Sequence, residues 1–141
     1  MILEQVSVFV ENKPGKLVEA LEVLSSADID MRALSLADTS DFGILRVIVD
    51  DPRVAFDELS KAGFLVKLNE VIPVEVNDEP GGFAAIMRVL SGANISVEYT
   101  YAFVAHERGK AFVILRVDDN DAAKRVLKEN GVKLLSSEEI G

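Results

Sequence analysis

The chain has 141 residues, no cysteine, 49% hydrophobic residues and a formal net charge of −9. These values exclude disulfides, thiolate metal sites and a cysteine nucleophile. They also argue against nucleic-acid binding, because no basic stripe offsets the acidic balance. No apolar run approaches the ~18 residues that a membrane span requires. The N-terminus lacks a basic leader before its apolar run, so we expect a soluble, cytoplasmic protein.

The first unit begins with an alternating run typical of a half-buried strand, with Val6, Val8 and Val10 on one face. A Pro-Gly turn follows, and then apolar residues recur at helical spacing over 17–24. Strands are predicted at about 29–37 and 44–50, joined by a turn at Asp38–Asp41. The alternation changes phase between Met31 and Leu34, which we interpret as a bulge.

A second helix follows, with its ends marked by the sequence. Asp51 and Pro52 are typical of a helix start, and Gly63 is typical of a helix end. The segment FLVKL, from Phe64, then predicts a fourth strand that ends near residue 69. The first unit therefore reads βαββαβ.

The same order is written again 66 residues later. ENKPGKL at 11–17 aligns with NDEPGGF at 77–83, and ADIDM at 27–31 aligns with ANISV at 93–97. After a two-residue insertion the two VDD segments align, and Gly63 aligns with Gly131. VKLLS, from Val132, predicts the last strand. Agreement in this order indicates a duplication, which predicts two domains at residues 1–70 and 71–141.

A βαββαβ chain of this size forms a four-stranded antiparallel sheet with two helices on one face. We therefore predict an α+β fold of two ferredoxin-like units in tandem. The face without helices is too apolar to meet water, so it should pack on the other repeat or on another chain. Its apolar members are Phe9, Ile44, Ile48, Phe112 and Ile114. Unpaired edge strands favour a homodimer.

The Pro-Gly turns suit a small zwitterion. Glycine lets the backbone approach closely, and the N–H groups at a helix start attract a carboxylate. Asn12 or Asp78 can accept a hydrogen bond from an ammonium group. The alternative interpretation is that these two side chains simply cap ordinary helices. The spacing fits both interpretations.

The segments that carry these turns, from VSVFVENKPGKL onward and from VEVNDEPGGF onward, resemble the ACT domain, a regulatory module of amino-acid metabolism. The whole chain is similar to small stand-alone tandem ACT proteins. The resemblance implies ligand binding at interfaces between paired domains, through the turn before the first helix and the second strand of a neighbour. It nominates Asn12, Lys13, Pro14, Gly15, Asp28 and Ile29 in the first unit. In the second unit it nominates Asp78, Glu79, Pro80, Gly81, Gly82, Asn94 and Ile95.

The resemblance thus implies a non-catalytic regulatory module that binds a small free amino acid without a cofactor, as a homodimer or with an amino-acid biosynthetic enzyme. No pattern of His, Asp and Glu predicts a metal site. Gly82 in place of Lys16 predicts a more open second turn, so we favour the second turn. One alternative is an assembly subunit that binds no ligand. Another is an acylphosphatase-like hydrolase, which would need an arginine that neither turn offers.

For several other polar and aromatic residues, a structural role is weighed against a contact with a ligand. Tyr99, Tyr101 and Phe103 share one strand face and predict a core, an interface or a ligand wall. Arg46 and Arg116 predict ion pairs with carboxylates, or contacts to a ligand carboxylate. Glu98 is expected to be a solvated carboxylate, and His106, the only histidine, an exposed loop residue.

Overall fold

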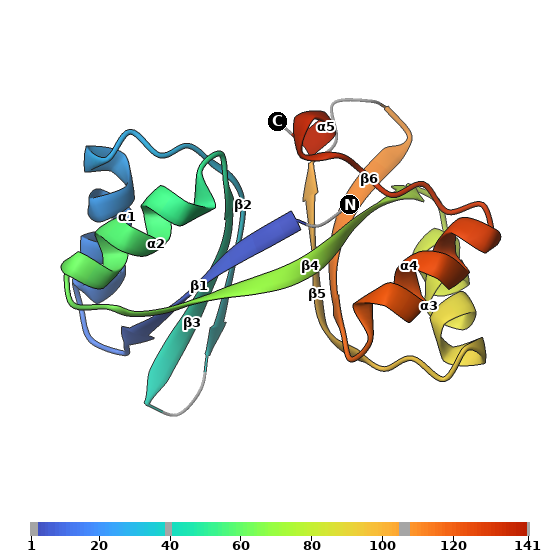
Figure 1. The fold of residues 1–141 in the computed structure, drawn as a ribbon, viewed down its shortest axis with the longest axis horizontal. Helices are drawn as coiled ribbons and strands as arrows, with labels where there is room; N and C mark the ends of the chain where they lie inside the picture. Colours follow the sequence, from blue (N-terminus) through green and yellow to red (C-terminus); the bar gives the residue numbers. More distant parts are fainter. Residues whose placement is uncertain (1–2, 39–40, 105–107, 141) are drawn as a thin grey trace. The chain divides into compact units, whose positions relative to one another are not determined.

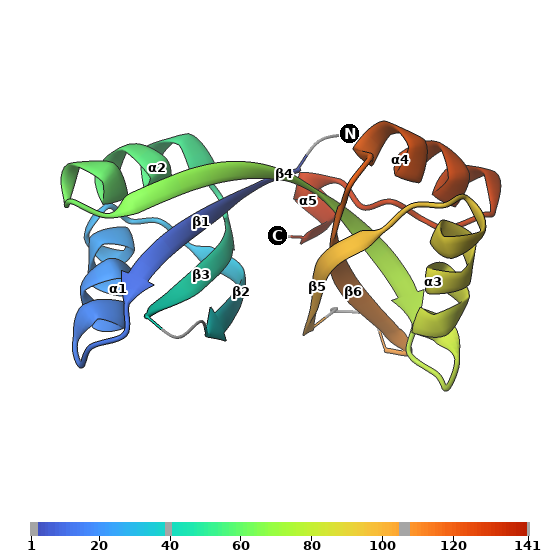
Figure 2. The same cartoon turned by 90° about the horizontal axis from the view of Figure 1, so that it is seen from below.

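A computed structural model describes residues 3–38, 41–104 and 108–140, and it divides into two compact units. One unit comprises residues 4–69, and the other comprises residues 70–140 together with Leu3. In each unit two long helices cover one face of a sheet (Figures 1 and 2). No helix in the described part of the chain is long and apolar enough to cross a membrane.

The unit of residues 4–69 contains β1 (Leu3–Glu11), α1 (Lys16–Ser26), β2 (Met31–Asp38), β3 (Phe42–Val49), α2 (Pro52–Lys61) and the first part of β4 (Leu65–Asn77). Its strand order is β2-β3-β1-β4, with antiparallel pairing of β3 to both β1 and β2. The register shifts between Met31 and Ala33. This shift confirms the bulge predicted from the phase change.

The unit of residues 70–140 contains the second part of β4, α3 (Gly82–Gly92), β5 (Val97–Val104), β6 (Lys110–Val117), α4 (Asn120–Glu129) and the short α5 (Ser137–Ile140). Its strand order is β4-β6-β5, and both pairings are antiparallel. The α+β fold of two ferredoxin-like units is confirmed. One detail differs, since the two strands predicted on either side of residue 70 form the single strand β4.

The predicted last strand, VKLLS, is wrong as a full strand, because only an isolated bridge joins Val74 and Leu134. Around this bridge the Glu75 N–H donates to the Lys133 carbonyl, and the Leu135 N–H donates to the Pro73 carbonyl. On the side of Leu135 a longer ladder would next need an N–H at position 73, and proline has none. The counterpart of Pro73 in the other unit is Ser7, which keeps its N–H.

Each unit has its own hydrophobic core between the helices and the sheet. One core includes Val6, Val8, Val10, Leu24, Leu45, Val47 and Leu59, and the other includes Ile72, Val74, Ile86, Leu90, Val113, Leu115 and Leu127. In β3 the core side chains alternate with Ile44 and Ile48, which therefore lie on the face without helices, as predicted. Ile48 and Ile114 are 1% and 0% exposed.

The helix ends follow the sequence signals. Asp51 accepts a hydrogen bond from the Val54 N–H at 3.2 Å, and Asp119 accepts one from the Ala122 N–H at 3.1 Å. The first N-cap confirms the predicted start of α2, and α4 begins in the same way. Gly63 lies in the left-handed region just after α2, with φ of 94°. The Gly63 N–H donates a hydrogen bond to the Ser60 carbonyl. The helix therefore ends just before Gly63, as predicted.

A small polar network lies within the unit of residues 4–69. Gln5 and Ser7 in β1 are 0% and 5% exposed. The Gln5 side-chain amide donates to the Ser7 hydroxyl at 3.0 Å, and that hydroxyl donates to the Asn69 side-chain carbonyl at 2.6 Å. The counterparts of Gln5 and Ser7 are Val71 and Pro73. The network is therefore particular to one of the two copies.

Candidate functional site

Each Pro-Gly turn ends in a left-handed glycine that is the N-cap of the following helix. Gly15 has φ of 88° and Gly81 has φ of 86°, a region that glycine adopts without steric cost. Within these described turns no side chain caps α1 or α3. The Asn12 and Asp78 N–H groups instead donate to carbonyls of Asp41 and Gly109. The interpretation of Asn12 and Asp78 as N-caps is therefore wrong.

The turn residues nominated from the sequence are accessible to a ligand. Asn12, Lys13, Pro14 and Gly15 are exposed, and so are Asp78, Glu79, Pro80 and Gly81. The Lys13 ammonium lies 3.3 Å from the Glu11 carboxylate, and both side chains are well exposed. An exposed pair of this kind exchanges readily with water or with a charged ligand.

Gly82 does not make the second turn more open. A Cβ at this position would overlap with the Asn77 carbonyl oxygen, so the backbone has closed into the space that a side chain would take. Gly82 is half-buried, and its own N–H donates to the Glu79 carbonyl at 3.0 Å. The openness predicted from the missing side chain is wrong, because a residue without Cβ allowed a closer approach of the main chain.

Asp28 and Asn94 lie at the other end of the first helix of each unit, where they terminate it. Both have left-handed backbones, with φ of 57° and 59°. Their N–H groups donate to the carbonyls of Ser25 and Ser91, and the following residue bonds five residues back, which forms a Schellman motif. Both side chains are exposed.

Ile29 and Ile95 follow these left-handed residues and pack against the two cores. They thereby supply the hydrophobic contact that accompanies such a helix end. Because α1 and α3 separate each turn from this pair, a single unit does not bring all of its nominated residues together. A ligand contact at Asp28, Ile29, Asn94 or Ile95 remains a prediction.

The helix-terminating role makes a prediction for Asn94. Asn94→Gly should leave the stability unchanged or raise it by up to about 1 kcal/mol, because glycine adopts the left-handed region at least as easily. Asn94→Val should lower it by about 1–2 kcal/mol, since a β-branched residue is strained there. Urea unfolding monitored by circular dichroism measures both. A clear loss with glycine would show instead that the asparagine side chain makes a contact of its own.

A pocket lies beside each Pro-Gly turn, at matching positions of the two units. The first-turn pocket, of about 480 Å³, is lined by Phe9, Glu11, Lys16, Glu19, Phe42, Phe64 and Leu65, among others. The second-turn pocket, of about 360 Å³, is lined by Glu75, Asn77, Gly82, Lys110, Val132 and Lys133, among others. Sequence reasoning missed both, because each joins a strand end, a helix start and the residues after the unit's second helix.

The second-turn pocket is crossed by polar contacts. The Lys110 ammonium donates to the Asn77 side-chain carbonyl at 2.7 Å and lies 4.0 Å from the Glu75 carboxylate. On its far side, Lys133 lies 2.8 Å from Glu139 in α5. The Lys133 hydrogen bond, aided by the Ser136 N–H, holds the pKa of the Glu139 carboxyl below its ordinary value. The lining of this pocket therefore carries three charged side chains, Glu75, Lys110 and Lys133.

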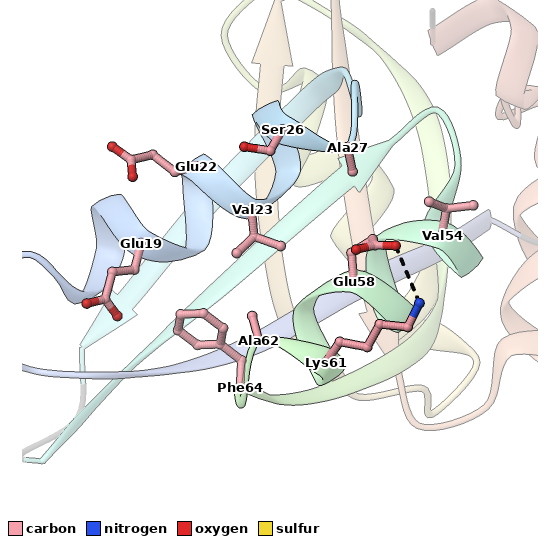
Figure 3. Close-up of a pocket in the computed structure, with 10 residues that line it drawn as sticks. All are labelled: Glu19, Glu22, Val23, Ser26, Ala27, Val54, Glu58, Lys61, Ala62 and Phe64. Carbon is pink, nitrogen blue, oxygen red and sulfur yellow. Dashed lines mark ion pairs between the residues drawn. The ribbon is translucent and has the colours of Figure 1, made fainter.

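A larger groove of about 800 Å³ runs between α1 and α2 (Figure 3). Its rim carries the carboxylates of Glu19, Glu22 and Glu58, and Lys61 pairs with Glu58 at 3.7 Å. Three carboxylates would repel the carboxylate of an amino acid. The groove is therefore a poor site for a free amino acid, even though its volume exceeds that of either turn pocket.

The remaining predictions concern the strands. The register places Tyr99, Tyr101 and Phe103 opposite Arg116, Ile114 and Phe112, which confirms that the three aromatic residues share one face. Phe103 and Phe112 contact edge to face at 5.4 Å.

Arg116 forms an ion pair with a carboxylate, as predicted. Its Nε lies 3.2 Å from the Glu98 carboxylate, and its Nη1 donates to the Glu70 carbonyl at 2.8 Å. Arg46 lies opposite Ser7 in β1 and Ser35 in β2. His106 lies outside the described residues. Among those that are described, no cluster of three His, Cys, Asp or Glu side chains could hold a metal ion.

Comparison with known proteins agrees with this duplicated architecture. A solved structure of a protein from Bacteroides thetaiotaomicron is 37% identical with a TM-score of 0.92, covering 99% of this chain and 96% of that one. The aspartate kinase regulatory subunits from Thermus thermophilus, in its ligand-free form, and Thermus flavus are 16% and 13% identical, with TM-scores of 0.63 and 0.65. The match to the Thermus thermophilus subunit covers 90% of this chain and 91% of that subunit. The match to the Thermus flavus subunit covers 92% of each chain. These two share the fold.

The comparison with curated proteins found no match. The family model described as the ACT domain pair, in contrast, matches residues 1–141, the full length of the chain. The chain therefore belongs to the ACT domain pair family.

Proposed function

We propose that this chain is a non-catalytic regulatory module that binds a free amino acid beside its Pro-Gly turns. The observation that carries the proposal is the pair of exposed turns, each leading into a helix without a side-chain cap, in a chain that matches the ACT domain pair over its full length. An uncapped helix start attracts a carboxylate, and acidic side chains beside it attract an ammonium group.

Regulation requires that the ligand bind one state of the protein or of its complex better than another. The regulatory subunits of aspartate kinase share this fold. By analogy with them, we propose that the chain acts on an enzyme of amino-acid biosynthesis, and that it does so as a homodimer or as a subunit of that enzyme. The analogy is one of fold, so the partner must be identified by experiment.

The alternatives make different demands. An acylphosphatase-like hydrolase would need an arginine in the phosphate-binding turn, and residues 12–15 and 78–81 contain none. An assembly subunit needs no ligand, and it would bind its partner equally well with or without amino acids.

A thermal denaturation series with each of the twenty amino acids at millimolar concentration tests the proposal. A ligand that binds only the folded state at 100 times its Kd stabilises that state by about 2.7 kcal/mol, which raises Tm by several degrees. We expect one chemical class of amino acids to raise Tm in proportion to saturation. If none of the twenty changes Tm, the sensor proposal fails and the assembly subunit is favoured.

A further inference from the structure

We infer that the first-turn pocket binds the amino acid, that it selects an apolar side chain, and that the second-turn pocket does not bind it. This inference rests on the proposed function and assigns the class of ligand.

The first-turn pocket presents apolar surface to solvent. Phe42 and Leu65 are 44% and 63% exposed, and both line this pocket together with Phe9 and Phe64. Packing does not require this surface, because the counterparts of Phe9, Phe42 and Leu65 are Glu75, Lys110 and Lys133. The duplicated fold thus tolerates charged residues at three positions where the first unit keeps large apolar ones. Contiguous exposed apolar surface of this kind marks a binding site.

The rim of the same pocket carries a cationic group and anionic groups, which can pair with the carboxylate and the ammonium group of a zwitterion. The Lys16 ammonium lies 3.4 Å from the Glu19 carboxylate, and Glu11 adds a second carboxylate on the side of the turn. An incoming carboxylate can take the place of Glu19 at Lys16, while Glu11 and Glu19 attract the ammonium group. The volume of about 480 Å³ lies within the range of small-molecule sites, roughly 300–1,000 Å³.

The second-turn pocket lacks the large exposed apolar side chains. Its position equivalent to Phe9 is Glu75, and its position equivalent to Phe42 is Lys110, which bonds to Asn77. The close approach of the Asn77 carbonyl to Gly82 further narrows the turn. An apolar side chain placed there would desolvate charged groups without replacing their hydrogen bonds, which is unfavourable.

Exchange of residues between the two units provides the test. Isothermal titration calorimetry with leucine, phenylalanine, serine and aspartate should show binding of leucine or phenylalanine at least tenfold tighter than of serine or aspartate. The double variant Phe42→Lys, Leu65→Lys installs the side chains of the second unit and should weaken binding at least tenfold. Lys110→Ala, the control beside the second turn, should leave the affinity unchanged.

A second readout does not depend on the double variant folding. In ¹⁵N-labelled wild-type protein, leucine or phenylalanine should shift the amide resonances of Gly15 and Gly63 and leave those of Gly81 and Gly131 in place. Leu65→Lys alone, at an exposed position, should reduce that shift.

The outcomes separate the inference from the proposed function. Shifts confined to Gly81 and Gly131, or affinity lost in Lys110→Ala, would overturn the inference and leave the sensor intact. Preference for serine or aspartate would do the same. Resonance changes that follow protein concentration and not added amino acid would show that a second copy covers the pocket, which also overturns the inference. No binding of any of the twenty amino acids would reject both proposals.

Discussion

Leu127→Ala is expected to lower the free energy of unfolding by about 2–5 kcal/mol, the cost of removing a buried leucine side chain and leaving a cavity. Leu127 in α4 is 0% exposed and belongs to the core of residues 70–140. Leu59, its counterpart in α2, is equally buried, so Leu59→Ala should cost a similar amount. Urea unfolding followed by circular dichroism measures both.

Leu34→Ala is the matched control, because Leu34 lies on β2 and is 54% exposed. Exposed substitutions of this kind change stability by about 0.5 kcal/mol or less. If Leu127→Ala cost no more than Leu34→Ala, the packing of α4 against β4 and β6 would be wrong.

Gly82→Ala is expected to destabilise the unit of residues 70–140 by about 1–3 kcal/mol, or more if the backbone cannot adjust. The added methyl group would overlap with the Asn77 carbonyl oxygen. The methyl group is attached directly to the first residue of α3, and the carbonyl belongs to the last residue of β4, so neither can move alone. A flexible side chain could move away from such a contact, but a carbonyl at a strand end moves only with its strand.

The control is Gly92→Ala, at the last residue of the same helix. A Cβ at Gly92 meets no heavy atom within 4 Å among the described residues, and the backbone is not left-handed. Alanine there should raise stability by up to about 1 kcal/mol through its better helix propensity. Equal effects of the two substitutions in urea unfolding would contradict the close approach at Gly82.

The sequence predicted the repeated βαββαβ order well, because period-two and helical patterns coincide with marked helix ends such as Asp51 and Gly63. The bulge near Met31 was also legible, since it changes the phase of the alternation. The continuity of β4 was missed. Residues 64–69 and 71–77 each have a strand pattern with no turn residue between them, and this pattern alone does not distinguish one strand from two. The failure of the last strand depends on a missing N–H at Pro73, on the strand that it would have to join.

The sites were less predictable. The Pro-Gly turns were evident, but which residue caps the helix depends on backbone angles, and the sequence favoured Asn12 over Gly15. Likewise, the missing side chain of Gly82 indicates space only if the surrounding backbone stays in place. The two pockets were invisible, because Phe9, Phe42 and Leu65 come together only when β1, β3 and β4 lie side by side.

The Gln5, Ser7 and Asn69 network bears on how a chain with two similar halves avoids folding incorrectly. Duplicated sequences can exchange equivalent strands, because each copy of a strand fits the other copy's neighbours. If residues 71–76 of a second copy took the place of β1, Val71 and Pro73 would meet Asn69, whose side chain would lose the hydroxyl that donates to it. Asn69 is half-buried, so the loss should cost less than the ~1–3 kcal/mol of a fully buried polar group that loses its partner. The three polar side chains are thus expected to favour β1 over its repeat at this position of the sheet.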